Sequence, residues 1–216
     1  MDTKTIVYII RHGESIGNKN KILLGRTDLD LSELGYLQAE ATKEELKDMK
    51  FEKIYSSPLK RAYNTAIPHA KIRDLDVVCV DNLMEIDLGE WENKSRDEIR
   101  ATEKDRYDIE WTQNFGTFAF KGGESSIECG ERFYRAMLEI VNDNYGKTIL
   151  VAAHGAVIRS FWAKISAIMP EDVGAKLPYP TNASYSILEY SDGTFTPIEY
   201  SIDKHLAGVG ITNINF

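Results

Sequence analysis

The stretch that decides the fold is IVYIIRHGES, residues 6–15. Its first five residues are apolar or aromatic, and the run ends abruptly at Arg11 and His12. This pattern is typical of a strand that is buried on both faces and delivers its last side chains to the edge of a parallel sheet. Because ligand sites in open α/β sheets lie at that edge, we expect Arg11 and His12 to face a functional site.

A second stretch repeats the arrangement far along the chain. Residues 148–153, TILVAA, form another short apolar run, and His154 and a glycine follow it directly. The chain has four histidines, and two of them, His12 and His154, close a predicted buried strand. If these strands are parallel neighbours, both imidazoles face one crevice. The other two, His69 and His205, have no motif around them, and we expect both to be structural.

The rest of the chain alternates short apolar runs with segments of helical periodicity. This alternation predicts a three-layer α/β fold in which helices flank a mostly parallel central sheet. We expect helices at 32–49 with Ser32 as N-cap, after Pro58, at 95–107, at 126–144 and directly after His154. We expect further strands at 54–57 and 77–80, and a hairpin at 185–200 that turns at 191–193. The polar helix at 95–107 is expected to be exposed.

The length of 216 residues suits one domain. We expect residues 1–216 to form it, with a small helical and aromatic cap inserted at about 90–125. The aromatic side chains from Trp111 to Phe120 have two interpretations. They form either a lid that lines the substrate pocket or the packed interior of the cap, and both alternatives stay open.

Composition and charge exclude several classes of partner. The net charge of −8 argues against nucleic acid or an anionic membrane surface. Every apolar run is far shorter than the roughly 18 residues of a membrane helix, and the run before Arg11 is too short for a signal peptide. The two cysteines, Cys79 and Cys129, lie in apolar patterns and make no disulfide framework. We therefore expect a cytoplasmic protein, and the sequence leaves its oligomeric state open.

Six blocks of the sequence resemble the histidine phosphatase superfamily, whose members include the phosphoglycerate mutases. The blocks are RHGESIGN at 11–18, GRTD at 25–28 followed by LS at 31–32, SSPLKRA at 56–62, EIDLGEWE at 85–92, GGES at 122–125 and HGAVIR at 154–159. An Arg-His-Gly motif alone would be weak evidence, but six blocks in the family's order and spacing are specific. The resemblance implies a phosphoglycerate mutase-like fold and a site for phosphoryl transfer.

Such a transfer sets requirements that particular residue types can meet. The nucleophile needs a free lone pair at neutral pH, and imidazole supplies one without a dedicated base, so we expect His12 to be the nucleophile. Planar guanidinium groups bind phosphoryl oxygens through paired hydrogen bonds, which is the role expected of Arg11 and Arg61. His154, if protonated, would be a further donor.

The leaving alkoxide of a phosphate ester needs a proton, which a carboxylic acid at the crevice can give. The resemblance implies that Glu85 gives this proton and then activates the attacking water. Four other acidic residues are alternatives for the role: Glu14, Asp87, Glu90 and Glu92. The resemblance also implies substrate contacts for Asn18, Gly25 and Gly155.

We predict neither a metal ion nor another cofactor. Two histidines could hold zinc, but hydrolytic zinc sites add carboxylate or further imidazole ligands at close spacing. The positive charge of Arg11 beside His12 would also oppose a dication. The predicted partner is therefore only a small phosphate ester.

The main hypothesis is a phosphomonoesterase that hydrolyses a small phosphorylated metabolite through phosphohistidine at His12. Compared with the mutases of the family, the segment from Glu85 to His154 is short, and Leu24 stands before Gly25 where mutases commonly have a small polar residue. An open site admits water, which favours hydrolysis. Two alternatives remain, namely phosphoryl transfer of the phosphoglycerate mutase type and a non-catalytic phosphate-binding or signalling module.

Overall fold

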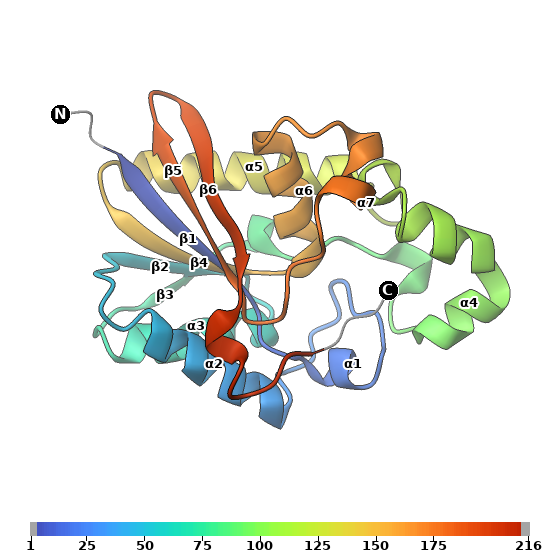
Figure 1. Ribbon diagram of the computed structural model, residues 1–216, viewed down its shortest axis with the longest axis horizontal. Helices are drawn as coiled ribbons and strands as arrows, with labels where there is room; N and C mark the ends of the chain where they lie inside the picture. The colour runs from blue at the N-terminus through green and yellow to red at the C-terminus, as the bar shows by residue number, and fades with distance from the viewer. Residues whose placement is uncertain (1–3, 213–216) are drawn as a thin grey trace.

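The computed structural model describes residues 4–212, which form one six-stranded sheet between two layers of helices (Figure 1). The strands are β1 (Thr5–Arg11), β2 (Lys53–Ser56), β3 (Val77–Cys79), β4 (Thr148–Ala153), β5 (Tyr185–Ser191) and β6 (Thr194–Ile202). Their order in the sheet is β3-β2-β4-β1-β5-β6. The first four pair in parallel, whereas β5 runs antiparallel to both of its neighbours. The predicted α/β fold with a mostly parallel sheet is confirmed.

Helices cover both faces of this sheet. In chain order, the α-helices of the described residues are α1 (Ile16–Lys19), α2 (Glu33–Glu45), α3 (Lys60–Lys71), α4 (Arg96–Asp105), α5 (Ser126–Asp143), α6 (Gly155–Ile165) and α7 (Val173–Lys176). Helices α2 and α3 pack together on one face, and α5 and α6 pack together on the other (Figure 1). Among residues 4–212, no helix combines the length and the apolar character needed to cross a membrane.

Strand β1 is buried on both of its faces. Val7 and Ile9 belong to the core beneath α5 and α6, whereas Ile10 packs with Ala66 and Ala70 of α3. Successive side chains of a strand point to opposite faces, so a strand covered on both sides has to be apolar throughout. The continuous apolar run of the sequence therefore places β1 in the interior of the sheet.

The helix expected to run to Met49 begins at its predicted cap, Ser32, but ends at Glu45. The reason is a long-range contact, because the guanidinium group of Arg73 donates hydrogen bonds to the backbone carbonyls of Leu46 and Met49. The last carbonyl groups of a helix need hydrogen-bond donors of this kind once the helix stops. Arg73 thus stabilises a turn where the sequence pattern alone would have continued the helix.

Two segments differ from the sequence prediction in their burial. Strand β3 pairs only with β2, so it is an edge strand, and its Val78 and Cys79 are exposed rather than part of an apolar core. Helix α4 is largely exposed, as expected, but its Ile99 is fully buried. One buried apolar side chain is enough to determine which face of a polar helix packs against the protein. The high proportion of charged residues in this helix gave no indication of that face.

The aromatic side chains between 111 and 120 pack against one another. Trp111, Phe115, Phe118 and Phe120 are all buried, and the ring centroids of Phe118 and Phe120 lie 5.7 and 5.1 Å from that of Trp111. Contacts at these distances are typical of edge-to-face aromatic clusters. The cluster is the interior of this segment, and Trp111 in addition lines the cavity described below.

His69 on α3 is fully buried, and neither of its ring nitrogens has a hydrogen-bond partner within the part of the chain that the structure describes. Burial, and then the nearby charge of Arg73, lowers the pKa of His69 from 6.5 to about 3. The unfolded chain takes up this proton below pH 6.5, whereas the folded protein does not until about pH 3. The free energy of unfolding is therefore not reduced by His69 above pH 6.5, and it decreases as the pH falls below this value because only the unfolded chain binds the proton.

We predict that His69→Leu removes this loss of stability. Between pH 7 and pH 5 the free energy of unfolding of the wild type should fall by about 2 kcal/mol more than that of the variant, since one proton corresponds to about 1.4 kcal/mol per pH unit. Urea unfolding of both proteins at pH 7 and at pH 5 measures these free energies. The contributions of all other titrating groups are the same in both proteins and cancel in the comparison. Equal pH dependence of the two proteins would contradict the prediction.

Candidate active site

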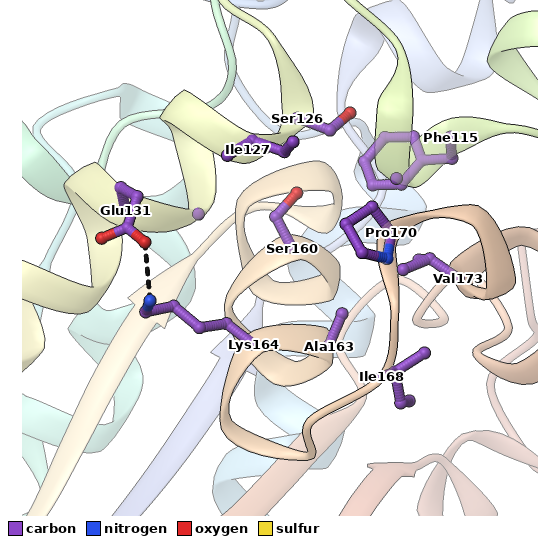
Figure 2. A pocket seen from close by; sticks show the side chains of 12 residues that line it. Phe115, Ser126, Ile127, Glu131, Ser160, Ala163, Lys164, Ile168, Pro170 and Val173 are labelled. Atoms are coloured by element: carbon purple, nitrogen blue, oxygen red, sulfur yellow. Dashed lines mark hydrogen bonds and ion pairs between the residues drawn. The ribbon is translucent and has the colours of Figure 1, made fainter.

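Two of the cavities in the structure differ sharply in chemistry. The larger one, about 200 Å³, lies between α5, α6 and the loop at Pro170, and is lined mainly by apolar side chains such as Phe115 and Val173 (Figure 2). The charged groups at its rim, Glu131 and Lys164, pair with each other at 2.6 Å. The described lining of this cavity holds two serine hydroxyls besides the ion pair but no imidazole or guanidinium group that could bind a phosphoryl group, and we do not assign the active site to it.

The second cavity lies where β1 and β4 end. Its walls include Arg11, His12, Asn18, Gly25, Arg61 and Glu85, together with Arg96, Trp111 and Tyr179. The parallel pairing of β1 with β4 sets Arg11 opposite Ala153, so the next residues, His12 and His154, emerge at the same edge. Their ring centroids are 5.2 Å apart.

His12 has a fixed ring orientation and a neutral ring. Its Nδ1 lies 2.6 Å from the carbonyl oxygen of Gly13. A carbonyl can only accept, so Nδ1 carries the proton and Nε2 keeps its lone pair. Burial, and then the charges of Arg61 and Arg11, hold the pKa of His12 well below its ordinary value. The imidazole is therefore unprotonated at neutral pH, and its Nε2 carries a lone pair.

Arg61 enters the cavity from the first turn of α3, and a loop fixes its guanidinium group. Its Nη2 donates to the carbonyl of Gly25 at 2.6 Å and its Nη1 to the carbonyl of Thr27 at 2.8 Å. Gly25 has a φ of +49°, and a Cβ there would lie 1.9 Å from a carboxylate oxygen of Glu92. Only glycine fits this position, and the loop it permits aims Arg61 into the cavity.

Arg11 is held from the opposite side by the segment before β5. One of its guanidinium nitrogens donates to the carbonyl of Pro180, and the group lies over the ring of Tyr179, 5.0 Å from its centroid. A Cβ on Gly155 would lie 2.3 Å from that ring. Gly155 therefore makes room for Tyr179, which in turn supports Arg11 through a cation–π contact.

Glu85 lies against the first turn of α6. Its Oε1 accepts hydrogen bonds from the backbone nitrogens of Ile86 at 2.9 Å and Val157 at 3.0 Å, and its Oε2 accepts one from Ala156 at 3.2 Å. Helix N-termini bind carboxylates in this way because their first N–H groups lack partners within the helix. The helix that follows His154 thus fixes the orientation of the Glu85 carboxyl group.

The four alternative acids are occupied elsewhere in the fold. Glu14 accepts a hydrogen bond from Ser32, Asp87 accepts one from the backbone of Gly89, Glu90 pairs with Lys121, and Glu92 holds the loop at residues 25–27. None of the four is among the described residues that line the cavity. Glu85 is the carboxyl group that the cavity wall presents.

His154 is neutral rather than protonated before an anion binds. Burial, and then the charge of Arg61, hold its pKa well below the ordinary value. Its Nε2 lies 2.7 Å from the hydroxyl oxygen of Ser57. A fully buried imidazole beside two guanidinium groups favours its neutral form, so the role of His154 as a cationic donor stays a conditional prediction.

Asn18 reaches the cavity from α1. Its Oδ1 accepts hydrogen bonds from the backbone of Ser15 at 3.2 Å and from the amide of Asn182 at 3.1 Å. With the oxygen held in this way, the amide nitrogen is the end that can donate to a bound anion.

The sequence did not identify Arg96 or Tyr179, although both line the cavity. Arg96 begins α4 and Tyr179 precedes β5, and neither belongs to one of the six blocks. Their place in the site depends on tertiary packing, for which the local sequence carries no signal. Within residues 4–212, no three or more histidine, cysteine or acidic side chains are arranged to hold a metal ion.

Comparison with known proteins gives a family match over most of the chain. Residues 7–203 match the model of the histidine phosphatase superfamily, branch 1. Phosphoserine phosphatase 1 of Hydrogenobacter thermophilus is 31% identical over 201 residues, which cover 93% of each chain. A metal-independent phosphoserine phosphatase of Arabidopsis thaliana is 29% identical over 214 residues, 98% of this chain and 87% of the relative.

Solved structures agree with the fold. YhfR of Bacillus stearothermophilus is 29% identical, with a TM-score of 0.87 over 94% of this chain and 99% of the other. A phosphoserine phosphatase variant of Entamoeba histolytica, solved in complex with phosphoserine, is 26% identical, with a TM-score of 0.79 over 94% and 99% of the two chains.

Proposed function

Because the chain belongs to branch 1 of the histidine phosphatase superfamily, we propose that it hydrolyses a small phosphorylated metabolite without a metal ion, through a phosphohistidine intermediate at His12. Relatives with this fold are named phosphatases, so the protein is a phosphomonoesterase. The observation that carries the proposal is the neutral His12 ring, whose Nδ1 is bound to Gly13 and whose Nε2 is available.

In the first step, Nε2 of His12 attacks phosphorus and the bond from phosphorus to the ester oxygen breaks. The guanidinium groups of Arg11 and Arg61 neutralise the charge of the phosphoryl oxygens, and the amide of Asn18 adds a donor. Glu85 gives its proton to the leaving oxygen. Oε2 of Glu85 accepts a single hydrogen bond, so it has room for this proton.

In the second step, water attacks the phosphohistidine, and the bond between phosphorus and Nε2 breaks. The ionised Glu85 takes a proton from the attacking water, which restores the acid, and phosphate leaves. Positioned charges and proton transfer are sufficient for both steps. No step requires an oxidant, a reductant or a metal-bound water.

Arg96 supports a narrower substrate class, namely phosphate esters with a second anionic group. It lines the same cavity as the two guanidinium groups of the phosphoryl site. Its charge is close enough to lower the pKa of Arg11, after the larger effect of burial. Two related phosphatases are named for phosphoserine, whose carboxylate is such a group.

We expect His12→Ala to lower the hydrolysis of p-nitrophenyl phosphate by at least about 10³-fold, because the variant lacks the attacking nitrogen and His154, the neighbouring imidazole, is not among the described residues that line the cavity. His69→Leu, a histidine change far from the cavity, should keep the wild-type rate. The rates of the wild type and of His69→Leu should survive exhaustive chelation with EDTA. Full activity of His12→Ala would contradict the proposal. So would wild-type activity that is lost on chelation and returns only with added zinc.

We expect Glu85→Gln to affect substrates according to their leaving groups. Hydrolysis of an alkyl phosphate such as phosphoserine should fall by about 10²-fold or more, whereas p-nitrophenyl phosphate should lose much less, since nitrophenolate departs without a proton. Steady-state rates on both substrates measure the contrast. Equal losses would assign the acid role to another residue.

We expect Arg96→Gln to raise the KM for phosphoserine about 10-fold and to leave the KM for p-nitrophenyl phosphate within about 2-fold, because only phosphoserine carries a second anion. Arg100→Gln, one turn further along α4 and exposed, is the matched control. An equal change in KM for both substrates would place Arg96 at the phosphoryl group rather than at a second anion.

A further inference from the structure

The GGES block at residues 122–125 has no part in the steps above, yet its Glu124 belongs to a largely buried ion pair beside the segment that carries Glu85. Glu124 lies just before α5 and pairs with Arg132 of that helix through two hydrogen bonds, at 2.8 Å from Nε and 2.9 Å from Nη2. Both side chains are largely buried, with 16% of Arg132 and 18% of Glu124 exposed. Paired geometry of this kind fixes the plane of the guanidinium group.

The rest of the Arg132 guanidinium group holds the segment that carries Glu85. Nη1 donates to the backbone carbonyls of Asn82 at 2.8 Å and Met84 at 3.0 Å, and Nη2 donates to the carbonyl of Glu85 itself at 3.2 Å. The segment has no strand or long helix of its own. Arg132 therefore donates the hydrogen bonds that these backbone carbonyls would otherwise accept within a helix or a sheet.

Glu124 holds the same segment on the other side of Glu85. Its Oε2 accepts a hydrogen bond from the backbone nitrogen of Asp87 at 3.0 Å, and its own backbone nitrogen donates to the carbonyl of Asp87 at 3.0 Å. A Cβ on Gly123 would lie 2.3 Å from that carbonyl, so the glycine lets the two backbones approach. Residues 82–87 are thus held at both ends by one ion pair.

We propose that the Arg132–Glu124 pair is a positioning device that holds the carboxyl group of Glu85 at the distance required for proton transfer to the leaving group. This inference rests on the acid role proposed above for Glu85. Neither residue belongs to the cavity wall, so neither touches the substrate. A misplacement of about 1 Å in a proton donor is enough to lower a rate by orders of magnitude.

The test is a double-mutant cycle between Arg132→Met and Glu85→Gln. Arg132→Met alone should slow phosphoserine hydrolysis at least about 10-fold more than p-nitrophenyl phosphate hydrolysis. In the Glu85→Gln background it should cost little further activity on phosphoserine, because a residue that acts through Glu85 has nothing left to position. Arg132→Lys, which keeps the charge, should recover part of the rate.

Two further variants separate this effect from a loss of stability. Arg135→Met, on the exposed side of the same helix, should leave both activities unchanged. Glu124→Gln, which breaks the ion pair but keeps an acceptor, should discriminate between the two substrates in the same direction as Arg132→Met. Circular dichroism and thermal unfolding establish that each variant is folded at the assay temperature.

The outcomes distinguish the inference from the proposed function. Equal losses on both substrates, or losses that add to those of Glu85→Gln, would make Arg132 a purely structural residue and overturn the inference. The proposed nucleophile would be unaffected by that result, because it depends on His12→Ala. Loss of the leaving-group contrast in Glu85→Gln itself would refute the acid role instead.

Discussion

The parallel pairing of β1 with β4 is the constraint on which the site depends. Both strands are buried on both faces, so their backbones can satisfy their hydrogen bonds only in the sheet, and their register is fixed by the cores above and below. A slip of one residue would turn Val7 and Ile9 to the wrong face. The same register delivers His12 and His154 together at one edge, so the packing that stabilises the fold also brings the proposed nucleophile next to the second imidazole.

Electrostatics at this edge follow from burial. A protein with a net charge of −8 repels an anionic ester at long range, so attraction has to come from local cations. Arg11 and Arg61 provide them, and backbone carbonyls rather than carboxylates hold both groups, which leaves their positive charge available to a phosphoryl group. Those two charges also keep both imidazoles neutral. One arrangement therefore favours both anion binding and an unprotonated nucleophile.

The sequence predicted what local pattern determines and missed what distant contacts determine. The class of fold, the hairpin and the helix faces follow from periodicity, which each segment carries in itself. The end of α2 depends on Arg73, 24 or more residues away, and the exposure of β3 depends on its place at the sheet edge. Arg96 and Tyr179 join the cavity wall only through tertiary packing. The resemblance of the six blocks to the family predicted Glu85, but no sequence pattern predicted that Arg132 would hold the segment that carries it.

The groups proposed for the reaction and those proposed to select the substrate lie in different parts of the chain. The groups proposed for the reaction come from the sheet edge and the helices beside it, where packing on both faces leaves little freedom to vary. Arg96 and Trp111 come from the segment that departs after Glu85 and returns at Glu124. The aromatic cluster packs this segment through contacts that do not involve His12, so changes in it can alter the pocket without disturbing the proposed nucleophile. Because the segment is closed by the same ion pair that holds Glu85, the proposed proton donor and the residues proposed to select the substrate share one structural support.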